Sequence, residues 1–348
     1  MAHIGIVGAG VAGAGAAYAL RETDHDVTLL EKSRGVGGRA ATRRRDGCRY
    51  DHGANYVKTP DDRTADLLYD LGEGGLVDVA EPVWTFDRNG DIEASDRQEE
   101  HKYTWEAGIT QLAKRLLAET DAAVRKTTRV ESLARDPDAD TWTATDTDGD
   151  EHGPFDALLL TPPAPQTADL LAATDWPGAD GTLAALRDAV DAAEFRTIRT
   201  FVLRYDFDLD VPWYGLVNVD KEHEVGWLSR EECKRGHVPD GGSLLIVQMS
   251  PEWSSARYDD PLSEAADAAA SYAADLVGDE RLTDPEWIDD QGWRYALPDA
   301  GLDSGSEAVE AAREAGLFVA GDWAAGEGRV HEAVWDGVAV GEAIDASL

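Results

Sequence analysis

The chain has 348 residues, 43% of them hydrophobic, and no apolar run approaches the ~18 residues of a membrane span. With 69 acidic and 32 basic residues its net charge is −37, which excludes the basic footprint that a nucleic-acid partner requires. Two cysteines, Cys48 and Cys233, imply no disulfide framework, and the N-terminus enters an apolar run at once. We therefore expect a cytoplasmic protein without a signal peptide.

The acidic residues are spread along the whole chain, and only seven of the basic residues are lysines. This composition is typical of adaptation to concentrated salt, because at ~1 M ionic strength the Debye length is roughly 3 Å and carboxylate repulsion is screened. The alternative, an acidic surface that binds cations or basic proteins, requires a localised patch, and the sequence shows none. We predict a halophilic protein with an acidic surface.

The first element is an apolar strand at residues 4–7, followed at once by Gly8, Gly10 and Gly13 in the G-x-G-x-x-G spacing. Gly8 permits a tight turn, Gly10 lets the backbone approach a pyrophosphate, and Gly13 lets the next helix pack closely on the strand. An Ala-rich helix and a second strand follow, and that strand ends on Glu31, where a carboxylate can accept hydrogen bonds from a ribose. This unit predicts dinucleotide binding.

A second glycine-rich loop, residues 35–39, follows Glu31 and ends on Arg39. A nicotinamide dehydrogenase has no need of such a loop. An extended FAD does, because its pyrophosphate and ribityl chain run past this loop and an arginine can neutralise phosphate charge. The loop therefore favours FAD over a nicotinamide dinucleotide.

The middle of the chain begins with a predicted hairpin at residues 84–93, built around an Asn-Gly turn. A helix is predicted over 108–119, with strands at 124–133 and 142–147. A buried strand at 157–160 ends at Thr161, where we expect the backbone to return to the cofactor.

An antiparallel sheet is predicted next, from alternating apolar runs that surround one helix. The strands are expected at 196–207, 213–219, 224–229, 244–249 and 287–297, and the helix at 263–276. Trp293 and Tyr295 alternate on the last strand, so both side chains face one side, and they could wall a flat pocket over a flavin.

Near the C-terminus a strand at 317–320 runs into Gly321 and Asp322, and a helix begins around Val330. This unit can place Asp322 at the ribityl or pyrophosphate region and a helix N-terminus under the flavin ring. Both ends of the chain are therefore expected to build one cofactor site.

The predicted fold is α/β, a Rossmann-type FAD-binding domain with an inserted α+β substrate domain on an antiparallel sheet. The discontinuous FAD-binding domain is expected at residues 1–80, 105–165 and 306–348, and the substrate domain at 81–104 and 166–305.

The segments GIVGAGVAG, LLEKSRGVGGRAATRR and YDHGANYVKT resemble the flavin amine oxidase superfamily. Residues 152–171, 226–231 and 318–344 resemble, more narrowly, bacterial renalase-like flavoproteins. The likeness runs from the first strand to the last helix and is looser over about 183–305. It implies non-covalent FAD, hydride transfer from 2- or 6-dihydro isomers of NAD(P)H to flavin N5, and reoxidation by O2 to give H2O2.

The resemblance and the motifs together give two sets of candidate site residues. The candidate cofactor contacts are Gly8, Gly10, Ala12, Gly13, Glu31, Lys32, Gly37, Gly38, Arg39, Asn55, Tyr56, Val130, Thr161, Gly321, Asp322, Val330 and His331. The candidate catalytic or substrate-contacting residues are Trp293, Tyr295, Tyr56 and His331, with Trp227 a further aromatic candidate.

His331 departs from the family, which usually has small residues where this chain has His331-Glu332-Ala333. It can contact the flavin or serve as an ordinary polar residue at a helix N-terminus. No metal site is expected, since there is no H-E-x-x-H motif and the cysteines are unpaired.

Two other functions compete with the renalase-like one. A flavin amine oxidase usually has a lysine near N5, and the only lysines after Lys126, Lys221 and Lys234, lie in charged, loop-like contexts. This disfavours amine oxidation. A non-catalytic FAD-binding protein is the second alternative, and it predicts bound FAD that no small reductant turns over.

Overall fold

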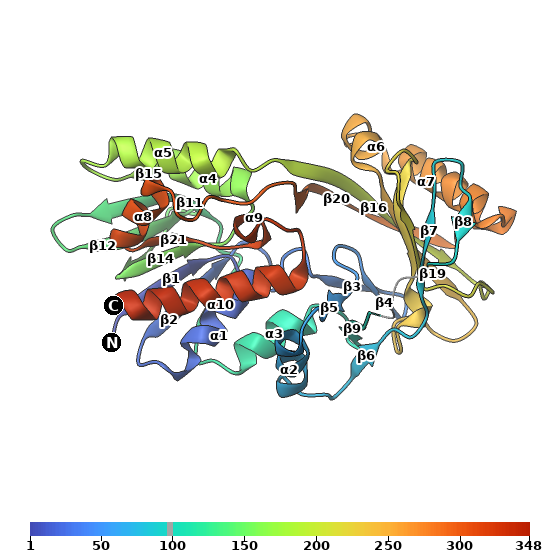
Figure 1. Cartoon of the computed structure of the whole chain (residues 1–348), viewed down its shortest axis with the longest axis horizontal. Helices are drawn as coiled ribbons and strands as arrows, with labels where there is room; N and C mark the ends of the chain where they lie inside the picture. Colours follow the sequence, from blue (N-terminus) through green and yellow to red (C-terminus); the bar gives the residue numbers. More distant parts are fainter. Residues whose placement is uncertain (96–99) are drawn as a thin grey trace. The chain divides into compact units, whose positions relative to one another are not determined.

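The computed structural model describes residues 1–95 and 100–348 (Figure 1). Residues 96–99, part of the expected segment 81–104, lie outside the described residues. The chain divides into two compact units. The first comprises Met1–Arg39, Leu112–Phe195 and Leu297–Leu348, and the second comprises Ala40–Gln111 and Arg196–Ala296.

The first unit is built on a parallel sheet with strand order β10-β2-β1-β14-β21. Its strands are β1 (His3–Val7), β2 (Asp26–Glu31), β10 (Ala123–Lys126), β14 (Ala157–Leu160) and β21 (Leu317–Val319). The inner strands β1 and β14 are short apolar runs, almost wholly buried as a parallel sheet covered on both faces requires, whereas the edge strand β10 is largely exposed. The first and last parts of the chain thus share one sheet, as the sequence predicts.

Two helices, α1 (Val11–Ala19) and α10 (Val330–Ser347), lie side by side against this sheet (Figure 1). Small residues let them approach closely. A Cβ on Gly15 would lie 2.6 Å from the carbonyl oxygen of Val334, and one on Gly337 would lie 2.1 Å from that of Ala12. The C-terminal helix is therefore held directly against the helix that opens with the glycine motif.

The rest of the first unit adds a second sheet and several helices. Its strands are β11 (Val130–Asp136), β12 (Thr141–Asp146), β13 (Glu151–Phe155) and β15 (Thr174–Asp175), in the order β13-β12-β11-β15. The helices are η1 (Leu20–Glu22), α3 (Gln111–Ala118), α4 (Ala164–Ala172), α5 (Asp180–Asp191), α8 (Glu307–Glu314) and α9 (Asp322–Ala325). Residues 166–195, which the sequence assigned to the substrate domain, lie in this unit because the apolar faces of α4 and α5 pack into its core.

The second unit contains a seven-stranded sheet with strand order β20-β16-β19-β18-β17-β7-β8. Its strands are β7 (Val83–Phe86), β8 (Ile92–Glu93), β16 (Phe195–Tyr205), β17 (Gly215–Asn218), β18 (Val225–Arg230), β19 (Ser243–Met249) and β20 (Trp287–Pro298). The predicted hairpin is confirmed by the pairing of β7 with β8. The sheet is antiparallel as predicted, except that β17 runs parallel to β7.

One face of this sheet carries the core of the second unit. Helices α6 (Pro251–Ala256) and α7 (Leu262–Val277) cover it, and the alanines of α7 pack on residues such as Leu228 and Val247 (Figure 1). Because side chains alternate along a strand, the neighbours Trp227 and Gln248 point to the opposite face. That second face is available to other segments of the unit.

The remaining elements of the second unit are shorter. They are β3 (Thr42–Arg45), β4 (Cys48–Asp51), β5 (Val57–Lys58), α2 (Asp62–Asp70), β6 (Leu76–Asp78), β9 (Lys102–Trp105), η2 (Glu231–Cys233) and η3 (Glu280–Thr283). Among the described residues, no helix of either unit has the length and apolar character needed to cross a bilayer. The fold class expected from the sequence, a Rossmann-type α/β domain with an α+β insertion, is confirmed.

Candidate functional site

The glycine motif forms the turn between β1 and α1. Gly8 has φ +101°, and a Cβ there would lie 2.5 Å from Thr161 Oγ1, while one on Gly13 would lie 2.2 Å from the carbonyl oxygen of Gly8. Thr161 in turn donates its hydroxyl hydrogen to the carbonyl of Val7 at 2.8 Å. The turn thus needs glycine at both positions, and it is tied to the end of β14.

Glu31 ends β2 with a carboxylate that faces the glycine turn and is only 6% exposed. The backbone N–H of Ala9 donates to Glu31 Oε2 at 2.8 Å, and that of Ser33 donates to Oε1 at 2.7 Å. Each oxygen keeps a second lone pair for a further donor. The carboxylate is fixed where a ribose diol would meet it, while the side chain of the adjacent Lys32 contacts Gln166 at 3.4 Å.

The second glycine loop lies against the first. Gly10 and Gly37 form an isolated parallel bridge, and the N–H of Gly37 donates to the carbonyl of Ala9 at 2.8 Å. Gly38 has φ +59°, and a Cβ on it would lie 3.3 Å from the Cα of Gly10. These contacts leave a side-chain-free backbone surface formed by both loops.

Arg39 and Asp322 join the N-terminal and C-terminal parts of this site. The guanidinium donates twice to the carboxylate, Nη1 to Oδ2 at 2.9 Å and Nη2 to Oδ1 at 2.6 Å. Asp322 begins α9 directly after Gly321, and its side chain is 8% exposed. The two residues expected on the phosphate and ribityl side of a cofactor are thus each other's partners.

The other candidates of the first unit are more loosely connected to this site. Val130 is buried at the start of β11, two residues after Thr128, whose N–H donates to the Glu31 carbonyl at 2.9 Å. Val330 begins α10, and His331 is 7% exposed with its Nε2 3.3 Å from the Glu332 carboxylate.

Asp336, which no sequence signal indicated, lies near Asp322. Its carboxylate accepts a hydrogen bond from the N–H of Gly321 at 2.7 Å. Burial raises the pKa of Asp336 to about 6, assisted by the negative charges of Asp322 and Glu332. A buried acid with a raised pKa beside a cofactor loop is a functional-site signal that requires tertiary structure to detect.

The raised pKa of Asp336 predicts how stability depends on pH. In the unfolded chain the carboxyl has its ordinary pKa of 3.8, so well below pH 4 it is protonated in both the folded and the unfolded state. Above about pH 6 it is ionised in both states, and its burial then costs the folded state up to about 3 kcal/mol. The unfolding free energy should therefore fall between these values, and Asp336→Asn should remove this part of the fall. Urea unfolding of both proteins at pH 4 to 7 checks it, and parallel curves would contradict it.

In the second unit, the segment at residues 52–56 crosses the open face of the large sheet. The carbonyl of His52 accepts from Trp293 Nε1 on β20 at 3.0 Å, and that of Gly53 accepts from the Gln248 amide on β19 at 2.8 Å. The Asn55 side-chain carbonyl accepts from the hydroxyl of Ser229 on β18 at 3.1 Å. One short segment thus contacts three strands of the sheet, β20, β19 and β18.

Aromatic rings gather at both ends of this segment. The Trp293 ring lies 5.4 Å from that of His52, and the Tyr56 ring lies 6.2 Å from that of Trp227 and 6.1 Å from that of Tyr214. Burial, with the positive charge of Arg43, lowers the pKa of His52 to about 4, so its imidazole is neutral at pH 7. Tyr295 follows on β20 with its side chain half-buried.

We call the rings of His52, Tyr56, Tyr214, Trp227 and Trp293 the aromatic face; of these, the sequence did not indicate His52 or Tyr214. Tyr214 stands out among them. It is fully buried, yet its hydroxyl has no hydrogen-bond partner among the described residues, and neither has the indole Nε1 of Trp227. Buried polar atoms are almost always paired, so these two adjacent rings carry hydrogen-bond donors that the described residues leave unused.

Beneath this face lies a buried cluster of four ionisable side chains: Asp51, Glu231, Lys234 and His237. The Lys234 ammonium lies 3.0 Å from Asp51 and 2.6 Å from Glu231, and His237 Nδ1 lies 2.8 Å from Glu231. Lys234 lies in a charged, loop-like segment directly after η2, as the sequence indicated, but its side chain does not point into solvent. The lysine is fully buried because η2 turns it inward onto the end of β4.

Asp51, Glu231 and His237 are close enough together to hold a metal ion, which no motif suggested. The ammonium of Lys234 already contacts both carboxylates, and therefore supplies the positive charge that a metal would bring. Burial alone would raise the pKa of Asp51, but Lys234 and His237 outweigh it and hold that pKa below its usual range.

Comparison with known proteins assigns the chain to a family. Residues 6–71 match the NAD(P)-binding Rossmann-like domain, and residues 79–344 match the flavin containing amine oxidoreductase family. The chain belongs to this flavin containing amine oxidoreductase family. Its members are flavin-dependent oxidoreductases, so the superfamily resemblance seen in the sequence is confirmed, while the narrower renalase-like resemblance is not specifically supported.

Solved structures similar to this chain share its fold at low identity. A protein from Exiguobacterium sp. 255-15, provisionally named a protoporphyrinogen oxidase, is 16% identical with a TM-score of 0.78, covering 100% of this chain and 99% of that one. Cyclohexylamine oxidase from Brevibacterium oxydans IH-35A is 13% identical with a TM-score of 0.74, covering 99% of each. A fatty acid isomerase from P. acnes is 15% identical with a TM-score of 0.69, covering 97% of each.

A curated relative matches only a short segment of this chain. The 4,4'-diapophytoene desaturase of Staphylococcus haemolyticus is 45% identical over 58 residues, which are 17% of this chain and 12% of that protein. The match thus spans about an eighth of the relative's length. A match of this length gives no basis for inferring the substrate of this chain.

The family implies a flavin, and the residues of the first unit fit FAD. Helix α1 has Gly10 at its N-cap with no side-chain cap, so its first N–H groups are left for an anion. The adjoining glycine surface would be filled by a Cβ, and Glu31 and Arg39 supply an acceptor and a cation. Gly8, Gly10, Gly13, Glu31 and Arg39 are therefore the residues that would hold the dinucleotide.

Arg39→Ala should weaken FAD retention roughly 10- to 100-fold, since hydrogen bonds to charged groups contribute about 1.5–3 kcal/mol. The variant also leaves the Asp322 carboxylate without its bidentate partner. Titration of apoprotein with FAD at high salt measures the effect. Arg34→Ala, an exposed arginine of the same loop, is the control, and equal weakening in both variants would refute a specific role for Arg39.

Proposed function

We propose that this chain binds FAD non-covalently in its first unit and oxidises a small, flat, reduced substrate. The substrate class we propose is the 2- or 6-dihydro isomers of NAD(P)H, with O2 as acceptor and H2O2 as product. Membership of the flavin containing amine oxidoreductase family supports the redox chemistry. The aromatic face supports the flat substrate.

When bound, FAD supplies the hydride acceptor. The chain's own part is to position the donor and exclude water. A dihydronicotinamide needs no general base, because its ring nitrogen lone pair expels the hydride and the product is aromatic. The neutral His52, whose ring is tilted by 30° against that of Trp293, and the rings of Tyr56 and Trp227 offer flat surfaces suited to such a ring.

The single observation that carries the substrate proposal is the pair of unpaired donors, Tyr214 Oη and Trp227 Nε1, on this aromatic face. A nicotinamide carries a carboxamide oxygen that can accept from them. The state of Lys234 also supports the proposal, since its ammonium is fixed between two carboxylates and is fully buried. A primary amine would find no free lysine there to assist it.

Anaerobic stopped-flow mixing at high salt tests the function. The 2- and 6-dihydro isomers should bleach the flavin rapidly, while 4-dihydro NADH and simple amines should do so slowly or not at all. Fast reduction by a primary amine, with the isomers inert, would make the chain an amine oxidase. Reduction by none of them would favour a non-catalytic FAD-binding protein.

Tyr214→Phe removes only the unpaired hydroxyl and should lower kcat/KM roughly 10- to 100-fold, since a substrate hydrogen bond contributes about 1–3 kcal/mol. Stability and FAD content should not change. The control is Tyr205→Phe, in which an equally buried hydroxyl that donates to the Leu282 carbonyl at 2.8 Å is lost. That variant should lose stability and keep its kcat/KM. Unchanged kinetics in Tyr214→Phe would contradict the assignment.

A further inference from the structure

The β3–β4 hairpin concentrates positive charge in a chain whose net charge is −37. It carries Arg43, Arg44, Arg45 and Arg49. Two of them have carboxylate partners: Arg43 lies 3.1 Å from Asp289, and Arg45 lies 3.4 Å from Asp46. These two arginines are accounted for by the fold.

Arg44 and Arg49 are different. Each donates one N–H to a backbone carbonyl, Arg44 to Ala107 at 3.1 Å and Arg49 to Gly236 at 2.8 Å. Neither forms an ion pair with a carboxylate in the described part of the chain. In a protein with more than twice as many acidic as basic residues, two arginines without an acidic partner require an explanation.

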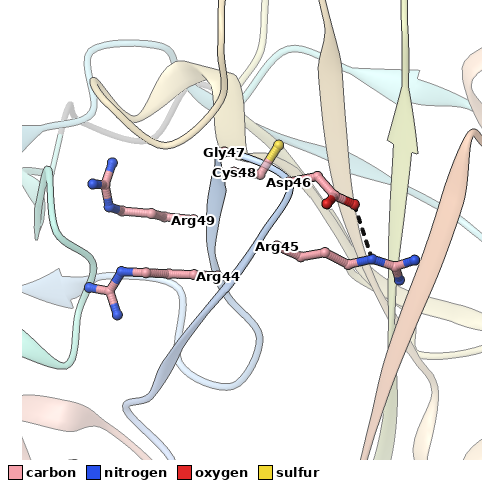
Figure 2. Close-up of a pocket in the computed structure, with 6 residues that line it drawn as sticks. All are labelled: Arg44, Arg45, Asp46, Gly47, Cys48 and Arg49. Carbon is pink, nitrogen blue, oxygen red and sulfur yellow. Dashed lines mark ion pairs between the residues drawn. The ribbon is translucent and has the colours of Figure 1, made fainter.

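The two guanidinium groups are also brought together. Arg44 and Arg49 are directly opposed partners in the antiparallel hairpin, so their side chains leave the same face. Figure 2 shows both extending to one side, while Arg45 and Asp46 form their ion pair on the other. Like charges opposite each other destabilise a strand pair, and a bound anion would offset this.

A further hydrogen-bond donor of the hairpin is left without a partner. Arg49 Nε is buried and has no hydrogen-bond partner among the described residues. A third cation, Arg235, precedes Gly236 and pairs with Glu106 at 2.6 Å. The hairpin itself borders an open depression of about 290 Å³, lined by Arg44, Arg45, Asp46, Gly47, Cys48 and Arg49 (Figure 2).

We propose that Arg44 and Arg49 form a binding site for a phosphate group, either inorganic phosphate or the phosphomonoester of a small molecule. Planar guanidinium forks match the oxygens of a tetrahedral oxyanion, and two of them match the charge of a phosphate dianion. The inference does not rest on the proposed redox function. It uses only donors that the hairpin's own contacts leave open.

The competing explanation is that both arginines only clamp the loops that contain Ala107 and Gly236. That role uses one N–H of each guanidinium. It does not explain why Arg49 Nε is unpaired or why two positive charges lie opposite each other in the hairpin. It predicts a loss of stability on substitution and no phosphate binding.

Equilibrium dialysis of the FAD-saturated protein against radiolabelled inorganic phosphate tests the site, with adenosine monophosphate as a second arm. Wild type should bind one phosphate per chain saturably, and less tightly as KCl is raised. Arg44→Gln/Arg49→Gln should weaken binding at least tenfold. Arg88→Gln, an exposed arginine of the same unit that pairs with Glu222 at 2.6 Å and does not line the depression, should leave it within twofold of wild type.

The two ligands distinguish a site for inorganic phosphate from a site for a phosphomonoester. Equal affinities would indicate recognition of phosphate alone, and tighter binding of adenosine monophosphate would indicate a phosphomonoester. If the double variant fails to fold, Arg44→Gln alone decides, because that side chain is exposed. Absence of saturable binding to wild type, or equal loss in Arg88→Gln, would overturn the proposal.

Discussion

Lys234→Met should destabilise the second unit by about 3–5 kcal/mol, the usual cost of removing one partner from a buried ion pair. The ammonium lies 3.0 Å from Asp51 and 2.6 Å from Glu231, and all three side chains are fully buried. Without it, two carboxylates remain in a low-dielectric interior with only His237 and neutral donors to compensate them. Urea unfolding at pH 7 measures the loss.

The matched control is Lys58→Met, in the same unit. Lys58 pairs with Glu100 at 2.6 Å, but both side chains are partly exposed, so its loss should cost only about 0–1 kcal/mol. The double variant Lys234→Met/Glu231→Gln should recover part of the stability, because it removes one uncompensated charge. A Lys234→Met protein within 1 kcal/mol of wild type would show that the cluster contributes little.

The loss in Lys234→Met should also depend on pH. In wild type the pKa of Asp51 is depressed, so its contribution to stability is present at neutral pH and is lost as the pH falls through its folded value. In the variant, the carboxylates left behind can be neutralised by protons. The difference between the two proteins should therefore shrink as the pH is lowered from 7.

The cluster also fixes the segment that carries the aromatic face. Asp51 precedes His52, and its N–H donates to Glu231 at 3.1 Å while its carboxylate accepts from Thr104 and from the N–H of Ile109, both at 3.0 Å. The end of β4 is thus held from several directions. Partial loss of this network should disturb Tyr56 and Trp293 before it unfolds the unit.

The sequence was sufficient wherever local chemistry determines the structure. The glycine turn is predictable because Gly8 requires a positive φ and Gly13 a close approach, and both are properties of a short motif. Glu31 follows from its place at the end of the second strand. The Asn-Gly hairpin follows equally from turn chemistry.

The sequence was insufficient where the site depends on contacts between distant residues. Lys234 meets Asp51 across 183 positions, and nothing in the charged segment around it indicates which lysine turns inward. Tyr214 is distinguished only by a hydroxyl that the fold leaves unpaired. Asp336 becomes unusual only because the fold buries it, with Asp322 and Glu332 nearby. Such properties arise from packing, and the hydrophobic periodicity of the sequence does not reveal them.

Low ionic strength should unfold the protein and release its FAD, because the net charge of −37 makes the compact state repel itself once screening is removed. The Debye length grows from about 3 Å at 1 M salt to about 30 Å at 0.01 M, so carboxylates across the whole surface then interact. If this repulsion amounts to about 5 kcal/mol, the melting temperature should fall by roughly 10–20 °C, at about 2–4 °C per kcal/mol.

Melting curves followed by both circular dichroism and flavin fluorescence, in dilute buffer and in multimolar KCl, measure this effect. Sucrose at matched osmolarity is the control, because it strengthens burial by exclusion from the surface but screens no charge. Recovery in KCl without equal recovery in sucrose would assign the loss to carboxylate repulsion. Equal melting temperatures in dilute buffer and KCl would instead mean that the spread of acidic residues, mixed with 25 arginines, is already balanced by local ion pairs such as Arg39–Asp322 and Arg43–Asp289.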